Sequence, residues 1–100
     1  MSDRRFFVYI MANKANNVLY TGVTNNLRRR IQEHREGTGG SFTQTYQVSK
    51  LVYFELYDDA RLAIDREKQI KGDPLQMKID LVNSMNPAWL DLYTRLPIDR

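Results

Sequence analysis

The chain has 100 residues, 42% of them hydrophobic, and a formal net charge of +3. This length and composition favour one globular domain with a modest core. Because there is no cysteine and only one histidine, disulfides, zinc–thiolate centres, thiol catalysis and multi-histidine metal sites are excluded. Any metal is then a hard cation held by carboxylate and water. We expect a single domain over residues 1–100, with an ordered core over about 5–93 and a fraying tail over 94–100.

The N-terminal segment and the charge bear on location and partners. After the first five residues comes an apolar run of only six or seven residues, which is too short for a secretory signal or a membrane span. We therefore expect a cytoplasmic protein with no membrane partner. The sequence pI of about 9.3 mildly favours polyanions. Four of the fifteen basic residues lie in one short segment, at Arg28, Arg29, Arg30 and Arg35.

Two apolar segments open the chain and predict a β-hairpin. Phe6 to Ala12 is rich in aromatic and β-branched residues, as is typical of a buried strand, and Asn13 to Asn17 supplies turn residues. Val18 to Val23 predicts the second strand. With an even number of residues in the loop, Tyr9 and Tyr20 lie opposite one another and project from the same face of the sheet.

Helical patterns and one more strand follow the hairpin. The first expected helix runs over about 26–35, is capped by Thr24 or Asn25, and is followed by a flexible loop over 37–41 and a polar segment over 42–46. A strand over 51–57 comes next, and then a helix that is capped by Asp58 or Asp59 and ends at Lys71. The last expected elements are a helix over 75–82, a break over 83–87 and a helical turn over 88–93 that packs Trp89 on the core. This order, ββαβαα, predicts a small α/β (α+β) fold with a three-stranded, mainly antiparallel sheet flanked by helices.

Two polar side chains lie beside the buried face of the first predicted helix. At about 100° per residue, Leu27 and Ile31 define its apolar stripe, and Arg30 and His34 lean with them toward the sheet. The residues that point outward are Arg28, Arg29, Glu33 and Arg35. A buried charge without a partner is costly, so Arg30 and His34 need partners. They are either a hydrogen-bonded core histidine and an arginine lying along apolar surface, or parts of a site.

The second predicted helix places a carboxylate within its apolar arc. Glu67 falls between Ala60 and Ala63, on the side that also carries Ile64 and Ile70. The opposite, wet face carries Arg61, Asp65, Lys68 and Gln69. Two interpretations of Glu67 stay open. It either pairs with Lys71 one turn later, or it is the single protein ligand of a Mg²⁺ ion, which typically keeps several waters.

Five polar side chains from different elements are placed so that they can face one cleft. They are Tyr9, Tyr20, Arg30, His34 and Glu67. A phenol, a cation and a metal-binding carboxylate are the parts needed to hydrolyse a phosphodiester. The phenol and the histidine manage the proton of the attacking water. The arginine and the metal stabilise charge on the phosphoryl oxygens and the leaving group.

The order and spacing of these residues resemble the GIY-YIG nuclease superfamily, and closely its small standalone bacterial members, which are similar to the N-terminal domain of excinuclease C. The matching features are Phe7-Val8-Tyr9, Tyr20-Thr21-Gly22, Arg30 and His34 eight and twelve residues after that glycine, a segment over 64–72 like the one that carries the family's metal-binding glutamate, and Asn86-Pro87-Ala88-Trp89. The first motif lacks its glycine and isoleucine, and threonine replaces isoleucine in the second. Neither departure removes a side chain with an assigned role.

The resemblance implies a role for each residue. Tyr9 is expected as general base or as the partner that orients the attacking water, Tyr20 as a group that binds near the same phosphate, and Arg30 as the clamp on that phosphate. His34 is expected to assist proton transfer, and Glu67 to bind Mg²⁺ or Mn²⁺. Gly22 and Asn86 are expected in supporting roles.

Three functions are compatible with these patterns. The leading one is a metal-dependent endonuclease acting on nucleic acid, DNA before RNA, as a monomer or weak dimer without an obligate protein partner. Its expected nucleic-acid contacts are Arg28, Arg29, Arg30, Arg35 and Lys71. The second is a non-catalytic nucleic-acid-binding module that uses the Arg28–Arg35 helix. The third is an assembly module that dimerises through its aromatic strands or the Trp89 region.

Overall fold

The computed structural model describes residues 5–96, in which three strands form one antiparallel sheet. The strands are β1 (Phe6–Ala12), β2 (Leu19–Thr24) and β3 (Lys50–Tyr57), in the spatial order β2-β1-β3. Strand β1 lies in the centre and pairs with both neighbours. Its continuous apolar run, FFVYIMA, suits a strand covered on both faces. The predicted α/β (α+β) class and the antiparallel three-stranded sheet are confirmed.

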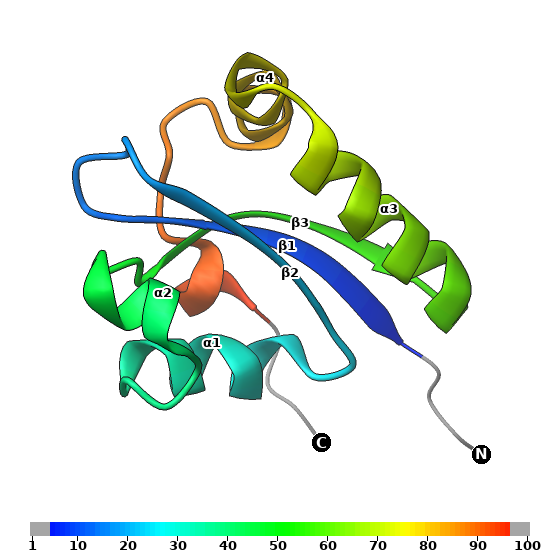
Figure 1. Cartoon of the computed structure of the whole chain (residues 1–100), viewed down its shortest axis with the longest axis horizontal. Helices are drawn as coiled ribbons and strands as arrows, with labels where there is room; N and C mark the ends of the chain where they lie inside the picture. The colour runs from blue at the N-terminus through cyan, green and yellow to red at the C-terminus, as the bar shows by residue number, and fades with distance from the viewer. Residues whose placement is uncertain (1–4, 97–100) are drawn as a thin grey trace.

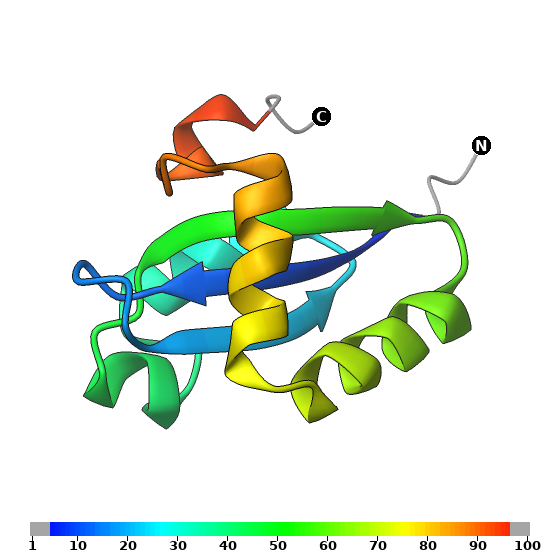
Figure 2. The same ribbon diagram turned by 90° about the horizontal axis from the view of Figure 1, so that it is seen from above.

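Helices cover both faces of the sheet (Figure 1). One face carries α1 (Leu27–Arg35), α2 (Ser41–Thr45) and the 3-10 helix η1 (Leu92–Arg95), and the other carries α3 (Ala60–Gly72) and α4 (Leu75–Met85). Figure 2 shows α4 crossing over the strands. Side chains of β1 alternate between the two cores. Val8 and Ile10 pack with α3 and α4, whereas Tyr9 and Met11 pack with α1.

The hairpin register differs from the predicted one by two residues. Tyr9 pairs with Gly22, and Tyr20 pairs with Met11, so the two tyrosines share a face without lying directly opposite. The cause is the turn. The side chain of Asn13 accepts hydrogen bonds from the backbone N–H groups of Asn17 and Val18. This closes the loop over residues 13–18 and delays the start of β2 to Leu19.

The predicted start of α1 is one residue early, and α2 was not predicted as a helix. The N-cap of α1 is Asn26, whose side chain accepts from the N–H of Arg29, rather than Thr24 or Asn25. The segment predicted as loop and polar stretch contains the five-residue helix α2. Its sequence, SFTQT, is too short to show an apolar period. Tertiary contacts hold it, because Thr43 is 2% exposed and its carbonyl accepts from the N–H of Val48 at 2.8 Å.

The C-terminal third follows the predicted order with shifted boundaries. Asp59 caps α3, which extends to Gly72, and α4 runs three residues past its predicted end. The turn predicted over 88–93 is instead a 3-10 helix that begins at Leu92. Trp89 does pack against the core, as predicted. Thr94 and Arg95 of the predicted tail belong to η1, and residues 97–100 of that tail lie outside the described range. Within the described chain, no helix is long and apolar enough to cross a membrane.

An ion-pair network fixes how α3 lies on the sheet. The guanidinium of Arg66 donates to both carboxylate oxygens of Glu55 on β3, at 2.9 to 3.2 Å. The hydroxyls of Tyr53 and Tyr57 donate to the same carboxylate. Burial alone would raise the pKa of Glu55, but these hydrogen bonds, led by Arg66, hold it below its usual value. The helix turns Ala63 and Ile70 inward, and Ile64, predicted on the apolar side, is 42% exposed.

We predict that Arg66→Met lowers the free energy of unfolding by about 2 kcal/mol, because it leaves a partly buried carboxylate without its cation. Urea denaturation followed by circular dichroism measures this loss. The double variant Glu55→Gln/Arg66→Met should recover much of the loss, since no unpaired charge remains. Lys68→Met, on the exposed face of the same helix, is the matched control and should change stability little. Equal losses in Arg66→Met and Lys68→Met would contradict the prediction.

Candidate functional site

The site is built around the phenol of Tyr9, which lies across its partner on β2. Tyr9 is 1% exposed, and Gly22 is its cross-strand neighbour. A Cβ atom at Gly22 would stand 2.5 Å from both Cζ and Oη of Tyr9. No side chain fits there, because contacts that short do not occur between non-bonded heavy atoms. Gly22 is therefore required here for a steric reason, and its supporting role in the site stays a prediction.

The Tyr9 hydroxyl reaches the one histidine of the chain. Its oxygen lies 3.0 Å from Nε2 of His34, and the other ring nitrogen, Nδ1, lies 2.9 Å from Oγ1 of Thr43. Thr43 has one hydroxyl proton, and the carbonyl of Gly40 accepts it at 3.2 Å. On this basis we assign the ring hydrogen of His34 to Nδ1, which then donates to Thr43. This tautomer leaves the lone pair of Nε2 to accept the Tyr9 proton.

The pKa values agree with this direction of donation. Burial raises the pKa of Tyr9 to about 12, so the phenol is protonated at neutral pH. Burial, together with the nearby charge of Arg30, lowers the pKa of His34 from the usual 6.5 to about 4, so the imidazole is neutral. His34 is 4% exposed. It is the hydrogen-bonded core histidine that the sequence allowed, and its partner is the candidate catalytic phenol.

Arg30 is held beside the same hydroxyl. Its two terminal nitrogens donate to the Glu33 carboxylate at 3.0 Å and to the Gly39 carbonyl at 2.9 Å. The Arg30 guanidinium also lowers the pKa of Tyr9, against the larger effect of burial. Gly39 itself packs on His34, because a Cβ there would stand 2.5 Å from Nδ1. The glycines predicted as a flexible loop thus allow close contact with α1.

The carboxylate of Glu67 approaches from the other side of the sheet. Helix α3 packs along β1 and β2, and Glu67 is 8% exposed. Burial is the main cause of the raised pKa of Tyr9, and the negative charge of Glu67 raises it further. The pKa of Lys71 is raised mainly by its hydrogen bond to Glu67 and slightly by the Tyr20 phenol. Glu67 therefore lies within electrostatic reach of the Tyr9 hydroxyl. The predicted pair with Lys71 is present, with Nζ 2.6 Å from Oε2 of Glu67.

Tyr20 completes the group from the β2 strand. Its ring centroid lies 5.3 Å from the ring of His34 and 6.3 Å from that of Tyr9. Tyr9, Tyr20 and His34 are thus connected by direct contacts, and Arg30 and Glu67 act on the pKa of Tyr9. Their catalytic roles stay predictions.

Two of the predicted nucleic-acid contacts face the C-terminal segment. Arg28 donates to the carbonyl of Leu96, and Arg35 pairs with Asp91; both guanidinium groups lie over the ring of Tyr93. Neither side chain simply points outward, as the helical spacing had predicted, because the chain returns over α1 through η1. By contrast, Arg29 keeps a side chain that is 66% exposed.

Asn86 has a structural position. Its amide nitrogen donates to the carbonyls of Val52 and Leu90, and its Oδ1 accepts from the N–H of Leu90. These bonds join the end of α4 to β3 and to the turn that follows. Thr43 and Gly39 are the site residues that sequence reasoning missed. Neither belongs to a periodic pattern, and their contacts with His34 arise only after α2 folds back over α1.

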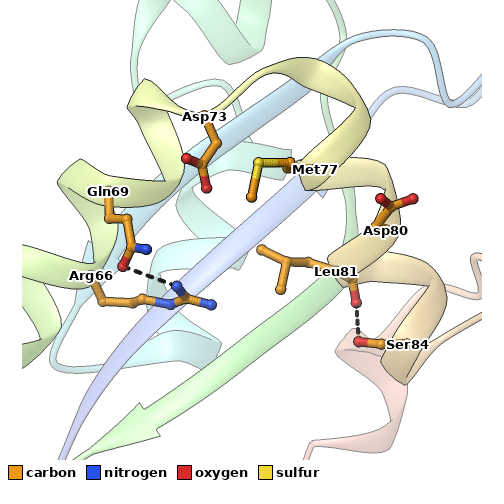
Figure 3. A pocket seen from close by; sticks show the side chains of 7 residues that line it. All are labelled: Arg66, Gln69, Asp73, Met77, Asp80, Leu81 and Ser84. Atoms are coloured by element: carbon orange, nitrogen blue, oxygen red, sulfur yellow. Dashed lines mark hydrogen bonds between the residues drawn. The ribbon is translucent and has the colours of Figure 1, made fainter.

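A separate cavity of about 250 Å³ lies between α3 and α4 (Figure 3). Several of its polar groups have partners. Arg66 donates to Gln69 and to Glu55, and the hydroxyl of Ser84 donates to the Leu81 carbonyl. None of the five candidate residues lines this cavity. The cavity is therefore separate from the Tyr9 cluster.

A divalent cation fits Glu67 only in one coordination scheme. Across residues 5–96 there is no group of three histidine, aspartate or glutamate side chains that could enclose a metal. Mg²⁺ is commonly bound by one or two carboxylates, with water and substrate phosphates as the other ligands. Glu67 can serve as that one carboxylate, in competition with the ammonium of Lys71 for Oε2. The expected Mg²⁺ or Mn²⁺ stays a prediction.

The chain is similar to a known catalytic domain and to small proteins that carry the name UPF0213. Residues 5–80 match the family described as GIY-YIG catalytic domain. A UPF0213 protein of Clostridium perfringens is 42% identical over 78% of this chain and 83% of its own length. A UPF0213 protein of Staphylococcus haemolyticus is 37% identical over 78% of this chain and 94% of its own length. The solution structure of a UPF0213 protein from Bacillus halodurans, 26% identical, covers 95% of this chain and 99% of its own, with a TM-score of 0.56.

We predict that His34 makes stability depend on pH between about 6.5 and 4. Its pKa falls from 6.5 in the unfolded chain to about 4 in the folded protein, so the folded state binds fewer protons in this window. Stability is full above pH 6.5 and falls as the pH drops, by up to about 3 kcal/mol from this group. Urea denaturation of the wild type and of His34→Gln between pH 4 and 6.5 measures the contribution of His34 to stability. Parallel pH profiles for the two proteins would contradict it.

Proposed function

The chain belongs to the GIY-YIG catalytic domain family, and on that basis we propose that it is a divalent-metal-dependent endonuclease that hydrolyses phosphodiester bonds in nucleic acid, with DNA the first candidate. One observation supports this most. A buried phenol donates to a neutral imidazole at 3.0 Å, while Arg30 and Glu67 both act on that phenol. A proton acceptor and a cation thus lie beside one hydroxyl, and a carboxylate acts on it through its charge, which are groups that hydrolysis of a phosphodiester can use.

The proposed proton path runs from water through Tyr9 to His34. As the oxygen of water bonds to phosphorus, its proton passes to the phenolic oxygen, and the phenolic proton passes to Nε2. With pKa values of about 12 for Tyr9 and about 4 for His34, a separated phenolate and imidazolium in the free protein would cost about 11 kcal/mol. The two transfers are therefore concerted. The ester oxygen leaves with the bonding electrons and takes a proton from solvent, and the His34 imidazolium releases its proton to solvent, which restores the neutral pair.

Arg30 and Glu67 manage the negative charge. Arg30 is restrained by Glu33 and by the Gly39 carbonyl, so its guanidinium is oriented before substrate arrives, which favours stabilisation of charge that develops on the phosphoryl oxygens. A Mg²⁺ or Mn²⁺ ion held by Glu67, water and phosphate would supply further charge neutralisation when bound. Lys71 pairs with the Glu67 carboxylate, with Nζ 2.6 Å from Oε2, and would contact the phosphate backbone of a bound substrate.

The alternative of a binding module on the Arg28–Arg35 helix has less support. Such a module needs several free cations along one helix face. Arg28 and Arg35 are engaged by the C-terminal segment, and Arg30 is held at the Tyr9 cluster. The nuclease accounts for the buried Tyr9–His34 pair, whereas a binding module gives that pair no task.

We predict that Tyr9→Phe, Arg30→Ala and Glu67→Gln each lower cleavage by at least about 100-fold, since each removes a group that acts on the reacting atoms. The assay is a panel of duplex, single-stranded, nicked, flap and branched DNA and of RNA, with Mg²⁺ and with Mn²⁺. Circular dichroism checks that each variant is folded. Asp65→Asn, on the exposed face of α3, is the control for Glu67→Gln. Wild-type activity of Glu67→Gln would refute the metal role.

We predict that Thr43 positions His34 and that Thr43→Val lowers kcat about tenfold with little change in KM, a smaller loss than removal of the base itself. Valine keeps the shape and removes the acceptor for Nδ1–H. Thr43→Ser should restore the rate. The ¹⁵N chemical shifts of the His34 ring report the tautomer directly and should change in Thr43→Val. Unchanged ring shifts together with a wild-type rate would show that Thr43 has no such role.

A further inference from the structure

A row of aromatic rings leads from the candidate site to the surface. The Tyr20 ring lies 5.8 Å from the ring of Phe42, which lies 4.8 Å from the ring of Tyr46. Exposure increases along the row, from 1% at Tyr9 to 44% at Phe42 and 50% at Tyr46. In the described range, Phe42 and Tyr46 are the aromatic residues among the large hydrophobic side chains that stay exposed. We define these two as the aromatic platform.

The fold does not explain the exposure of this platform. Helix α2 has five residues, and Thr43 is the one that it buries. The bonds of that threonine anchor the helix. Phe42 and Tyr46 are one turn apart and touch each other, but such a pair stabilises a short helix only slightly. Phe42 and Tyr46 thus remain 44% and 50% exposed, and these two adjacent rings form a small apolar patch that a ligand can cover.

We propose that the aromatic platform stacks an unpaired nucleobase next to the phosphate that is cut. The inference rests on the proposed nuclease function and names its substrate class. That class is nucleic acid with an unpaired nucleotide at the cleavage position, such as a single strand or a flap, in preference to continuous duplex. Bases inside a duplex are stacked on both faces, whereas an unpaired base can stack on an aromatic side chain.

The occupant follows from the position of the platform. Phe42 contacts Tyr20, and Tyr20 contacts His34, the proton acceptor of the proposed reaction. A phosphate bound at Arg30 and Tyr9 therefore has its neighbouring base within reach of Phe42. The rings are tilted by 33° and 45° to one another, so they are not stacked flat on each other. Because every base has a π-face, the platform selects unpaired structure and not sequence.

The test measures binding without cleavage. Wild type and variants are titrated, in EDTA, against single-stranded DNA that carries 2-aminopurine, against the same strand with an abasic residue at that position, and against the duplex. Fluorescence of 2-aminopurine reports stacking, and anisotropy of an end label reports affinity. Phe42→Ala and Tyr46→Ala should each weaken binding of the intact single strand about tenfold. Binding of the duplex and of the abasic strand should change little.

Conservative variants separate the effect of aromatic stacking from the effect of an apolar side chain of similar size. Phe42→Trp should keep wild-type affinity and quenching, while Phe42→Leu, which stays apolar and loses the ring, should behave as Phe42→Ala. Leu62→Ala, at a side chain on α3 that is 53% exposed, is the control and should leave affinity unchanged. Tyr46→Ala leaves Tyr20 and its contact with His34 intact. It therefore distinguishes loss of the platform from damage to the site.

The outcomes keep the two proposals apart. If binding depends on the base and requires Phe42, but the protein cuts no substrate of the panel, the platform is supported and the proposed nuclease function is contradicted. If single strand and duplex are cut equally well, and Phe42→Ala cuts as well as the wild type, the proposed platform is contradicted and the proposed nuclease function is supported. Equal weakening for intact and abasic strands, or no binding at all, also overturns the platform. Sedimentation that shows a dimer dissociated by Phe42→Ala would assign this face to a second copy of the chain instead.

Discussion

The contact on which the rest of the site depends is the ring of Tyr9 lying across Gly22. This close approach carries the hydroxyl toward the β2 edge of the sheet, where α1 can meet it. At that edge the hydroxyl donates to Nε2 of His34 at 3.0 Å. Any Cβ at residue 22 would collide with the phenol, and a displaced phenol would leave His34 without its buried partner. The glycine thus acts by its size and needs no unusual backbone angle.

The sheet lets groups from both of its faces act on one oxygen. Tyr9 points toward α1, so Arg30 and His34 reach it directly, while Glu67 on α3 acts on it through its charge. The two charges have opposite effects, since Arg30 lowers the pKa of Tyr9 and Glu67 raises it. Their balance depends on how α3 lies on the sheet. The bond between Glu55 and Arg66 therefore supports the site indirectly, because Arg66 is the neighbour of Glu67 on that helix.

Local patterns were enough to predict the strands, the main helices and the shared face of Tyr9 and Tyr20. Patterns with periods of two and 3.6 residues also placed His34 and Glu67 on inward faces. What they could not predict depends on contacts between distant residues. The side chain of Asn13 set the hairpin register, and the return of the chain to Leu96 engaged Arg28, 68 positions earlier. Thr43 lies in a helix of five residues that only tertiary contacts hold, so no sequence period marks it.

Burial keeps this histidine neutral over a wider pH range than an exposed one, while it also makes the imidazole a weaker base. At its ordinary pKa of 6.5, a histidine is largely protonated in mildly acidic solution and cannot accept from a phenol. Burial and the charge of Arg30 lower the pKa of His34 to about 4, so its lone pair stays available. The same burial keeps the Tyr9 proton in place until a substrate arrives. Solvent exposure increases from Tyr9 and His34 through Tyr20 to Phe42. The groups proposed to transfer protons are therefore buried, and the ring proposed to stack a base is exposed to solvent.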